Sequence, residues 1–123
     1  YYHKGDNVNA LKWVNELRRN RIEGVTDLTE STLPEVRTGD RIATDCNGKP
    51  LTPLLQAIFD ERRKELFMEG DRCFELKRNG RPEWWVISNG LKYTTKAYLY
   101  TSPISKSDID LNPDIVQNPG YVY

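Results

Sequence analysis

Three glutamates at every fourth position, Glu61, Glu65 and Glu69, have the spacing in this chain that comes closest to catalytic chemistry. On a helix such residues share one face, with neighbouring Cβ atoms about 5–6 Å apart, which falls within the carboxylate separation of a retaining glycosidase. That chemistry needs two carboxylates on opposite sides of a sugar, whereas neighbours on a helix point the same way. The arginines beside these glutamates favour ion pairs instead, and we predict that the protein is not an enzyme.

The cysteines and the histidine do not form a metal site. Cys46 and Cys73 lie far apart, and His3 is the single histidine, so the ligand set of a zinc site is missing. The run from Asp45 to Gly48 resembles half of a calcium loop, but no acidic ligand follows at the spacing of an EF-hand. We interpret this run as a turn and predict no metal and no cofactor. If the protein is exported, an oxidising environment would allow Cys46 and Cys73 to form a disulfide.

Two adjacent tryptophans, Trp84 and Trp85, are the predicted ligand-binding residues. Successive residues of a strand project to opposite faces, so one indole can enter a core while the other reaches solvent. An exposed indole offers a large, rigid surface to the apolar face of a sugar ring. The alternative is that both tryptophans pack in a core or at a domain interface.

The longest element with helical periodicity runs from Leu54 to Gly80. Thr52 can cap it and Pro53 suits its first turn, while apolar residues recur along one side at helical spacing. After a break, residues 72–78 predict a second short helix with Phe74 facing inward.

Charged residues interrupt the apolar side of this segment. Arg62 lies on that side, where an unpaired buried charge would cost several kcal/mol. We therefore expect Arg62 and Arg72 to pair with carboxylates of the same segment, for which the candidates are Glu61, Glu65 and Glu69. Asp60 has the spacing to pair with Lys64 one turn later.

Helical periodicity also marks residues 1–22, with apolar positions at Val8, Leu11, Val14 and Leu17. A glycine turn before this helix gives the shape of a tetratricopeptide hairpin cut at its start, although such repeats need neighbours to bury their faces. Residues 23–51 are polar and without periodicity, which predicts a long loop.

The C-terminal residues 81–123 predict mostly irregular structure. β-forming residues at 84–87 and 96–101 indicate short strands, with Asn89-Gly90 as a hairpin turn. Three prolines near the end exclude a regular helix across the tail. The residues expected to cap single turns there are Asp108 and Asn112.

The composition narrows the choice of partner. The 123 residues are the size of one domain, and 18 Lys and Arg balance 18 Asp and Glu, which gives no indication of nucleic acid as a partner. Hydrophobic residues make up only 37%, yet three Trp and seven Tyr argue against disorder.

No stretch of the sequence reaches the length of about 20 apolar residues that a membrane-spanning helix needs. With no signal peptide and Tyr1 in place of Met, we expect the chain to be part of a longer protein.

Two motifs resemble the SusD/RagB family. The family pattern for the first reads ER, EL, EG, R, DL, R, and its residues here are Glu61-Arg62, Glu65-Leu66, Glu69-Gly70, Arg72, Glu75-Leu76 and Arg78. Glu75 stands where the family usually has Asp, and Cys73 where it usually has an aromatic residue. The second motif reads PIP, EI, NP, QNPGY; here Asn112-Pro113 and Gln117 to Tyr121 match it fully.

The resemblance covers nearly the whole chain and implies the C-terminal part of a mainly α, SusD-like fold with tetratricopeptide-like helices, long irregular loops and at most short β-strands. Residues 1–22 would end a tetratricopeptide-like hairpin, 52–80 would be the signature helix pair, and 81–123 the irregular C-terminal segment. Members of the family are surface lipoproteins of Bacteroidetes outer membranes that bind glycans, sometimes peptides, and cover a SusC-like TonB-dependent transporter. This implies binding of a starch- or other polysaccharide-derived oligosaccharide during nutrient uptake, without catalysis or a cofactor.

A helical-repeat module for protein partners shares these fold signals and is the alternative function. Helices gain most of their stability from tertiary packing, and the loop and the tail have few partners within the sequence. We therefore expect the chain to pack against the N-terminal part of the same protein. The apolar residues expected to face that part are Leu11, Val14, Ile58 and Phe59.

Overall fold

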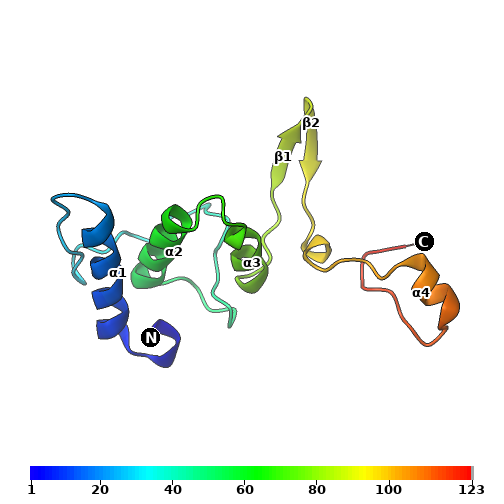
Figure 1. The fold of residues 1–123 in the computed structure, drawn as a ribbon, viewed down its shortest axis with the longest axis horizontal. Helices are drawn as coiled ribbons and strands as arrows, with labels where there is room; N and C mark the ends of the chain where they lie inside the picture. The colour runs from blue at the N-terminus through cyan, green and yellow to red at the C-terminus, as the bar shows by residue number, and fades with distance from the viewer. Residues whose placement is uncertain (123) are drawn as a thin grey trace. The chain divides into compact units, whose positions relative to one another are not determined.

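A computed structural model describes residues 1–122, which form two compact units, one from Tyr1 to Gly80 and one from Arg81 onward. The described residues contain four α-helices, two short 3-10 helices and one two-stranded sheet (Figure 1). The predicted mainly α-helical fold with long loops and short strands is confirmed. None of the helices in this part of the chain is long and apolar enough to cross a membrane.

The first unit is helical. Its elements are η1 (Tyr2–Lys4), α1 (Asn7–Arg21), α2 (Pro53–Glu65) and α3 (Asp71–Arg78). The Asp6 carboxylate caps α1 by accepting a hydrogen bond of 3.1 Å from the Asn9 backbone N–H. At the start of α2 the Thr52 hydroxyl accepts from the Leu55 N–H at 3.2 Å, as predicted for this cap.

The core of the first unit lies between α1 and α2, and the loop and α3 contribute further side chains to it. Its buried apolar side chains are Ala10, Val14, Ile42, Leu51, Leu54, Leu55, Ala57, Phe59 and Leu76. Val14 and Phe59, expected to face a companion, are thus already covered within this unit, while Leu11 and Ile58 are half-buried. The apolar faces of α1 and α2 thus cover part of each other within this unit.

The inward orientation predicted for Phe74 is wrong. Phe74 is 59% exposed, whereas Leu76, two residues later, is only 3% exposed. Residues two apart on a helix lie about 200° around its axis, so the two side chains cannot both face the core. The neighbouring Glu75 is buried with Leu76 because two arginines pair with its carboxylate.

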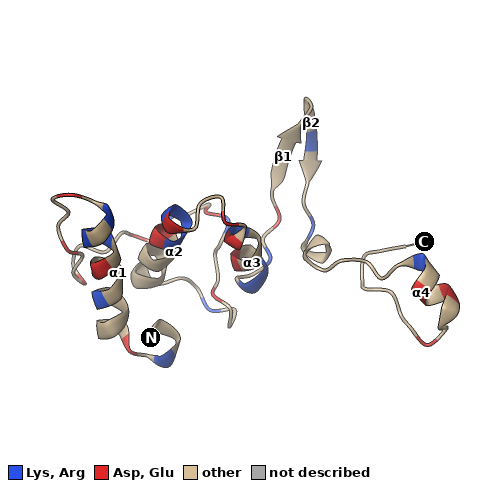
Figure 2. Ribbon diagram, viewed as in Figure 1, with Lys and Arg blue, Asp and Glu red and all other residues tan. Residues whose placement is uncertain are grey.

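The charged network of α2 and α3 forms, but with partners that differ from the predicted ones. Arg62 donates to Asp71 at 2.6 Å and to Glu75 at 3.1 Å, and Arg72 donates to Glu75 at 2.5 Å. Figure 2 shows acidic and basic residues side by side on these helices. The second short helix brings its own carboxylates to the arginine, so the glutamates of α2 are left for other partners.

Those other partners come from α1 and the loop. Glu61 accepts from Arg18 of α1 at 3.0 Å and from Lys64 at 2.9 Å. The predicted Asp60–Lys64 pair is therefore wrong, because Asp60 is engaged by Arg37 of the loop. A long-range arginine that can make two hydrogen bonds to one carboxylate competes well with a helical neighbour that contributes a few tenths of a kcal/mol.

The loop between α1 and α2 is held at defined points. The buried Asn15 side chain of α1 donates to the Leu28 carbonyl and accepts from the Leu28 N–H, each at 2.8 Å. The Asp45 carboxylate accepts from the N–H groups of Asn47 and Lys49, both at 2.8 Å, which confirms the predicted turn. Both cysteines are free, Cys46 in this turn and Cys73 in α3.

The second unit begins with a hairpin of β1 (Trp85–Ser88) and β2 (Leu91–Thr94), paired antiparallel from Trp85↔Thr94 to Ser88↔Leu91. Asn89 and Gly90 form its two-residue turn with φ of 51° and 76°, the positive values that a type I′ turn requires. The turn was predicted, but the strand at 96–101 is wrong. A two-residue turn places the partner strand directly after Gly90, and residues 97–100 form the 3-10 helix η2 (Ala97–Tyr100) instead.

The tail contains one short helix, α4 (Lys106–Leu111), capped by Ser105 and not by Asp108 as expected. The Asn112 side chain accepts from the Asp114 N–H at 3.1 Å, which confirms a local turn at that position. In the resembling family motif PIP, Ser105 stands in place of the second proline, and its hydroxyl gives α4 a cap that proline cannot supply.

The Gln117-to-Tyr121 motif ties the end of the chain back to the residues after η2. The Gln117 amide accepts from the Ile104 N–H and donates to the Ile104 carbonyl, each at 2.9 Å. Tyr121 donates to the Thr101 carbonyl at 2.9 Å, and its ring meets that of Tyr98 edge-on with centroids 5.0 Å apart. The motif thus orders an irregular segment through hydrogen bonds made by its own side chains.

Candidate functional site

The structure separates the two tryptophans predicted as ligand contacts. Trp84 is half-buried and packs against Tyr100, with ring centroids 6.1 Å apart. Trp85 is 55% exposed on β1. Because neighbours on a strand point to opposite faces, Trp84 serves the packing of the second unit while Trp85 presents its indole to solvent.

Trp85 belongs to a small exposed surface on the hairpin. Cross-strand partners share a face, so one face carries Trp85, Ile87, Lys92 and Thr94, which we call the indole face. The Lys92 amine lies 5.0 Å from the centroid of the Trp85 ring, within the range of a cation–π contact. The indole face therefore combines a flat aromatic surface with a cation.

Residues at the base of the hairpin fix the position of this face. The Trp84 N–H donates to the Thr95 hydroxyl at 2.8 Å, and the Thr95 N–H donates to the Trp84 carbonyl at 2.7 Å. Glu83 accepts from the Ala97 N–H at 3.0 Å and pairs with Lys96 at 3.0 Å. The Ala97 N–H, followed by Lys96, holds the pKa of Glu83 below its usual value, so this carboxylate stays ionised at neutral pH.

Sequence reasoning missed Lys92. With the second strand placed at 96–101, nothing brought this lysine near the tryptophans. The Asn89-Gly90 turn carried the necessary signal, because a two-residue turn sets residue 92 opposite Ile87 and diagonal to Trp85.

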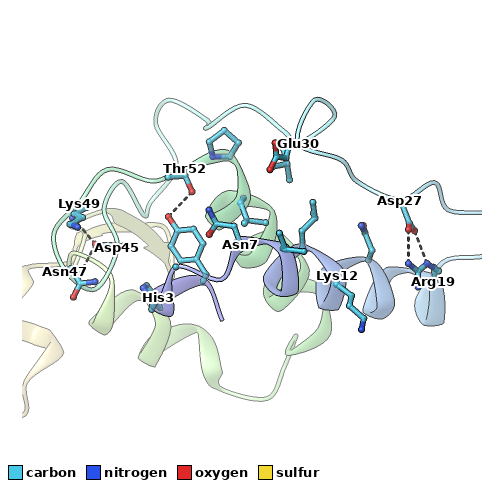
Figure 3. A pocket seen from close by; sticks show the side chains of 18 residues that line it. His3, Asn7, Lys12, Arg19, Asp27, Glu30, Asp45, Asn47, Lys49 and Thr52 are labelled. Atoms are coloured by element: carbon cyan, nitrogen blue, oxygen red, sulfur yellow. Dashed lines mark hydrogen bonds and ion pairs between the residues drawn. The ribbon is translucent and has the colours of Figure 1, made fainter.

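A polar groove of about 810 Å³ is a second candidate, in the first unit. Figure 3 shows it along η1, α1 and the loop that follows α1, where the labelled side chains come from all three elements. The Tyr2 and Thr52 hydroxyls form a hydrogen bond of 2.9 Å across the groove. The Arg19 guanidinium donates two hydrogen bonds, of 2.9 and 2.7 Å, to the Asp27 carboxylate. Among its charged residues, Arg19 pairs with Asp27 and the Asp45 carboxylate accepts from backbone N–H groups. The lining residues come from distant parts of the sequence without a local motif.

An apolar cavity of about 670 Å³ lies on the other side of the same helices. Its apolar lining comes from α1 and α2 and includes Trp13, Leu17 and Ile58, while residues of η1 and α3 and the charged side chains of Glu61, Arg62, Glu75 and Arg78 complete it. Trp13 is 54% exposed. A recess of this kind can accept apolar side chains of another protein segment.

Of the glutamates considered for glycosidase chemistry, two are engaged in ion pairs, and Glu69 lies beyond the end of α2. Glu61 pairs with Arg18 and Lys64, and Glu65 receives a hydrogen bond of 2.8 Å from Arg21. Within residues 1–122 no group of three or more His, Cys, Asp or Glu side chains could hold a metal ion. The Cys46 sulfur lies 3.8 Å from His3 Nε2, a contact of two residues.

Comparison with known proteins gives one match. A family model described as the SusD family matches residues 1–121. Neither a curated protein nor a solved structure matches the chain. The matched range includes both motifs, the hairpin and the two cavities.

Proposed function

We propose that this chain, which belongs to the SusD family, takes part in glycan binding at the cell surface during nutrient uptake. The family match confirms the resemblance seen in the two motifs, and proteins of this family bind carbohydrates without catalysing a reaction. The ligand would be an oligosaccharide derived from starch or another polysaccharide.

The observation that supports this proposal is the exposed indole of Trp85. A pyranose ring has an apolar face of C–H groups, and a rigid aromatic surface covers it at low cost in side-chain entropy. The hairpin holds Trp85 through the Trp84–Thr95 hydrogen bonds, so the indole is positioned before a ligand arrives. Trp84 is proposed to contribute indirectly, through its packing against Tyr100.

The proposed setting is the outer membrane, with the protein held there as a lipoprotein and a SusC-like TonB-dependent transporter as its partner. The N-terminal part of the same protein is the proposed occupant of the apolar cavity beside Trp13. Its apolar side chains would cover Trp13 and Ile58. These assignments rest on family membership and on the exposed apolar surface of α1.

Isothermal titration calorimetry of the full-length protein with a panel of neutral and acidic oligosaccharides tests the proposal. Trp85→Ala should weaken binding of the best ligand at least tenfold, a loss of about 1.4 kcal/mol. Phe67→Ala is the control, because Phe67 is an exposed aromatic residue of the other unit and lines neither of the two cavities. Equal affinities of the two variants would remove Trp85 from the site, and a panel without any binding would contradict a glycan-binding role.

A further inference from the structure

We propose that the glycan bound at Trp85 is anionic, with a carboxylate or sulfate group that pairs with Lys92. This inference rests on the proposed function and narrows its ligand class. It follows from the position of the Lys92 amine, 5.0 Å from the centroid of the Trp85 ring.

The hairpin register sets this arrangement. Lys92 is paired with Ile87, and Trp85 with Thr94, so Lys92 and Trp85 stand on the same face one step apart along the strands. Diagonal neighbours on a sheet are within reach of aromatic and long side chains. The two side chains are therefore placed together by the backbone, and a ligand on the indole lies within reach of the amine.

The charges on this face are not balanced. Lys96 is neutralised by Glu83 at 3.0 Å, whereas among the described residues no carboxylate lies within 4.0 Å of the Lys92 amine. The indole face therefore carries a net positive charge beside its aromatic surface. A charge left open at the edge of a binding surface favours a ligand of opposite sign.

An anionic sugar suits this pair better than a neutral one. A sugar that stacks over the Trp85 ring on the side of Lys92 must displace the amine and forfeit its contact with the ring. A neutral sugar offers the displaced ammonium only uncharged hydroxyl acceptors, while a uronate or a sulfated sugar offers a charged acceptor and so forms an ion pair with it. The apolar face of the same ring still covers the indole.

The test measures the affinity of the full-length protein for three length-matched ligands. These are an oligogalacturonate, which carries carboxylates, a carrageenan oligosaccharide, which carries sulfates, and a neutral maltooligosaccharide. At least one anionic ligand should bind ten times more tightly than the neutral one. Lys92→Met, which keeps the linear stem and removes the charge, should lose about tenfold for that anionic ligand and change little for the neutral one.

An exposed lysine of the other unit serves as the control. Lys77 lies on α3 and lines neither of the two cavities. Lys77→Met should leave the affinities unchanged. Raising the salt concentration should weaken anionic binding in the wild type more than in Lys92→Met, because salt screens the charge that the variant lacks.

The possible outcomes separate the two proposals. Loss of affinity in Trp85→Ala but not in Lys92→Met would contradict the proposal of an anionic ligand and would leave the proposal of glycan binding at Trp85 standing. Preference for the neutral oligosaccharide would overturn it as well. No binding of any oligosaccharide would overturn both proposals. The sulfate and carboxylate ligands then tell which anion the amine recognises.

Discussion

Arg62 of α2 and Glu75 of α3 form the link between the two helices of the first motif, with Arg62 Nε donating to Glu75 Oε1 at 3.1 Å. The Glu75 side chain is only 3% exposed, while that of Arg62 is 42% exposed. Arg72 donates to the other oxygen of the same carboxylate at 2.5 Å. A buried carboxylate is tolerated here because two guanidinium groups surround it.

Arg62→Ala should therefore destabilise the protein more than loss of an exposed ion pair does. Glu75 would keep Arg72 but lose one of its two cations in a buried position. Arg62 is partly exposed and solvent screens part of its charge, so we expect a loss of about 1–2 kcal/mol in the free energy of unfolding. Denaturant unfolding of the full-length protein measures this loss.

Arg63→Ala is the matched control for that variant. The Arg63 side chain is 41% exposed and approaches Asp40 at 3.4 Å, a longer and weaker contact. We expect it to cost less than 1 kcal/mol. If the two variants unfold at the same denaturant concentration, the Arg62–Glu75 link has no special role.

Local signals in the sequence were enough for the start of α2 and for the hairpin turn. Thr52 caps α2 and Asn89-Gly90 joins the strands because each depends only on residues within a few positions. The need of Arg62 for a carboxylate was also predictable from its place on the apolar side. The identity of that carboxylate was not, because it depends on how α3 folds back onto α2.

The failures share this cause. Asp60 pairs with Arg37 from 23 positions away in the sequence, and helical spacing cannot reveal such a partner. Lys92 joins the candidate site only through strand register, so an error in placing the second strand hid it. The polar groove combines α1 with loop residues, and the sequence between them has no periodicity from which a contact could be inferred.

Asn15→Ala should loosen the loop between α1 and α2. The Asn15 amide makes two hydrogen bonds of 2.8 Å with the backbone of Leu28, and their loss leaves the Leu28 N–H and carbonyl without this partner. We expect a cost of about 1–3 kcal/mol. Hydrogen exchange should show faster exchange at Leu28 and its neighbours. Asn20→Ala, which removes an exposed side chain of the same helix, should leave that exchange unchanged.

Acidification should destabilise the contact of the loop with α2 through Asp40. Burial raises the pKa of this carboxyl, but the hydrogen bonds from Arg37 and the Arg41 N–H and the charge of Arg63 lower it below its ordinary value of 3.8. A carboxyl with a lowered folded-state pKa stabilises the protein at pH above its unfolded value, and this stabilisation is lost as the pH falls through the folded value.

The stability of the protein should thus fall as the pH drops below about 4, and part of this fall should disappear in Asp40→Asn. Thermal unfolding between pH 7 and pH 3 measures both slopes. The variant should be less stable than the wild type at pH 7 and closer to it at pH 3. Parallel curves across the whole range would show that Asp40 does not contribute to the pH dependence.

Gly120→Ala should disrupt the closure of the tail. Gly120 has a φ of 93°, and a Cβ at this position would lie 2.5 Å from Cγ of the Tyr98 ring. Any side chain would push Tyr98 away and break its edge-on contact with Tyr121.

Gly24→Ala controls for backbone strain alone, since Gly24 also has a positive φ of 67° but has no atom within 4 Å of the position that its Cβ would take. The strain common to both should cost about 1 kcal/mol, and the clash should add more in Gly120→Ala. Limited proteolysis of the full-length protein should therefore cut the tail faster in Gly120→Ala than in Gly24→Ala. Equal rates of tail cleavage would mean that the glycine of this motif serves only the turn and not the packing of the two tyrosines.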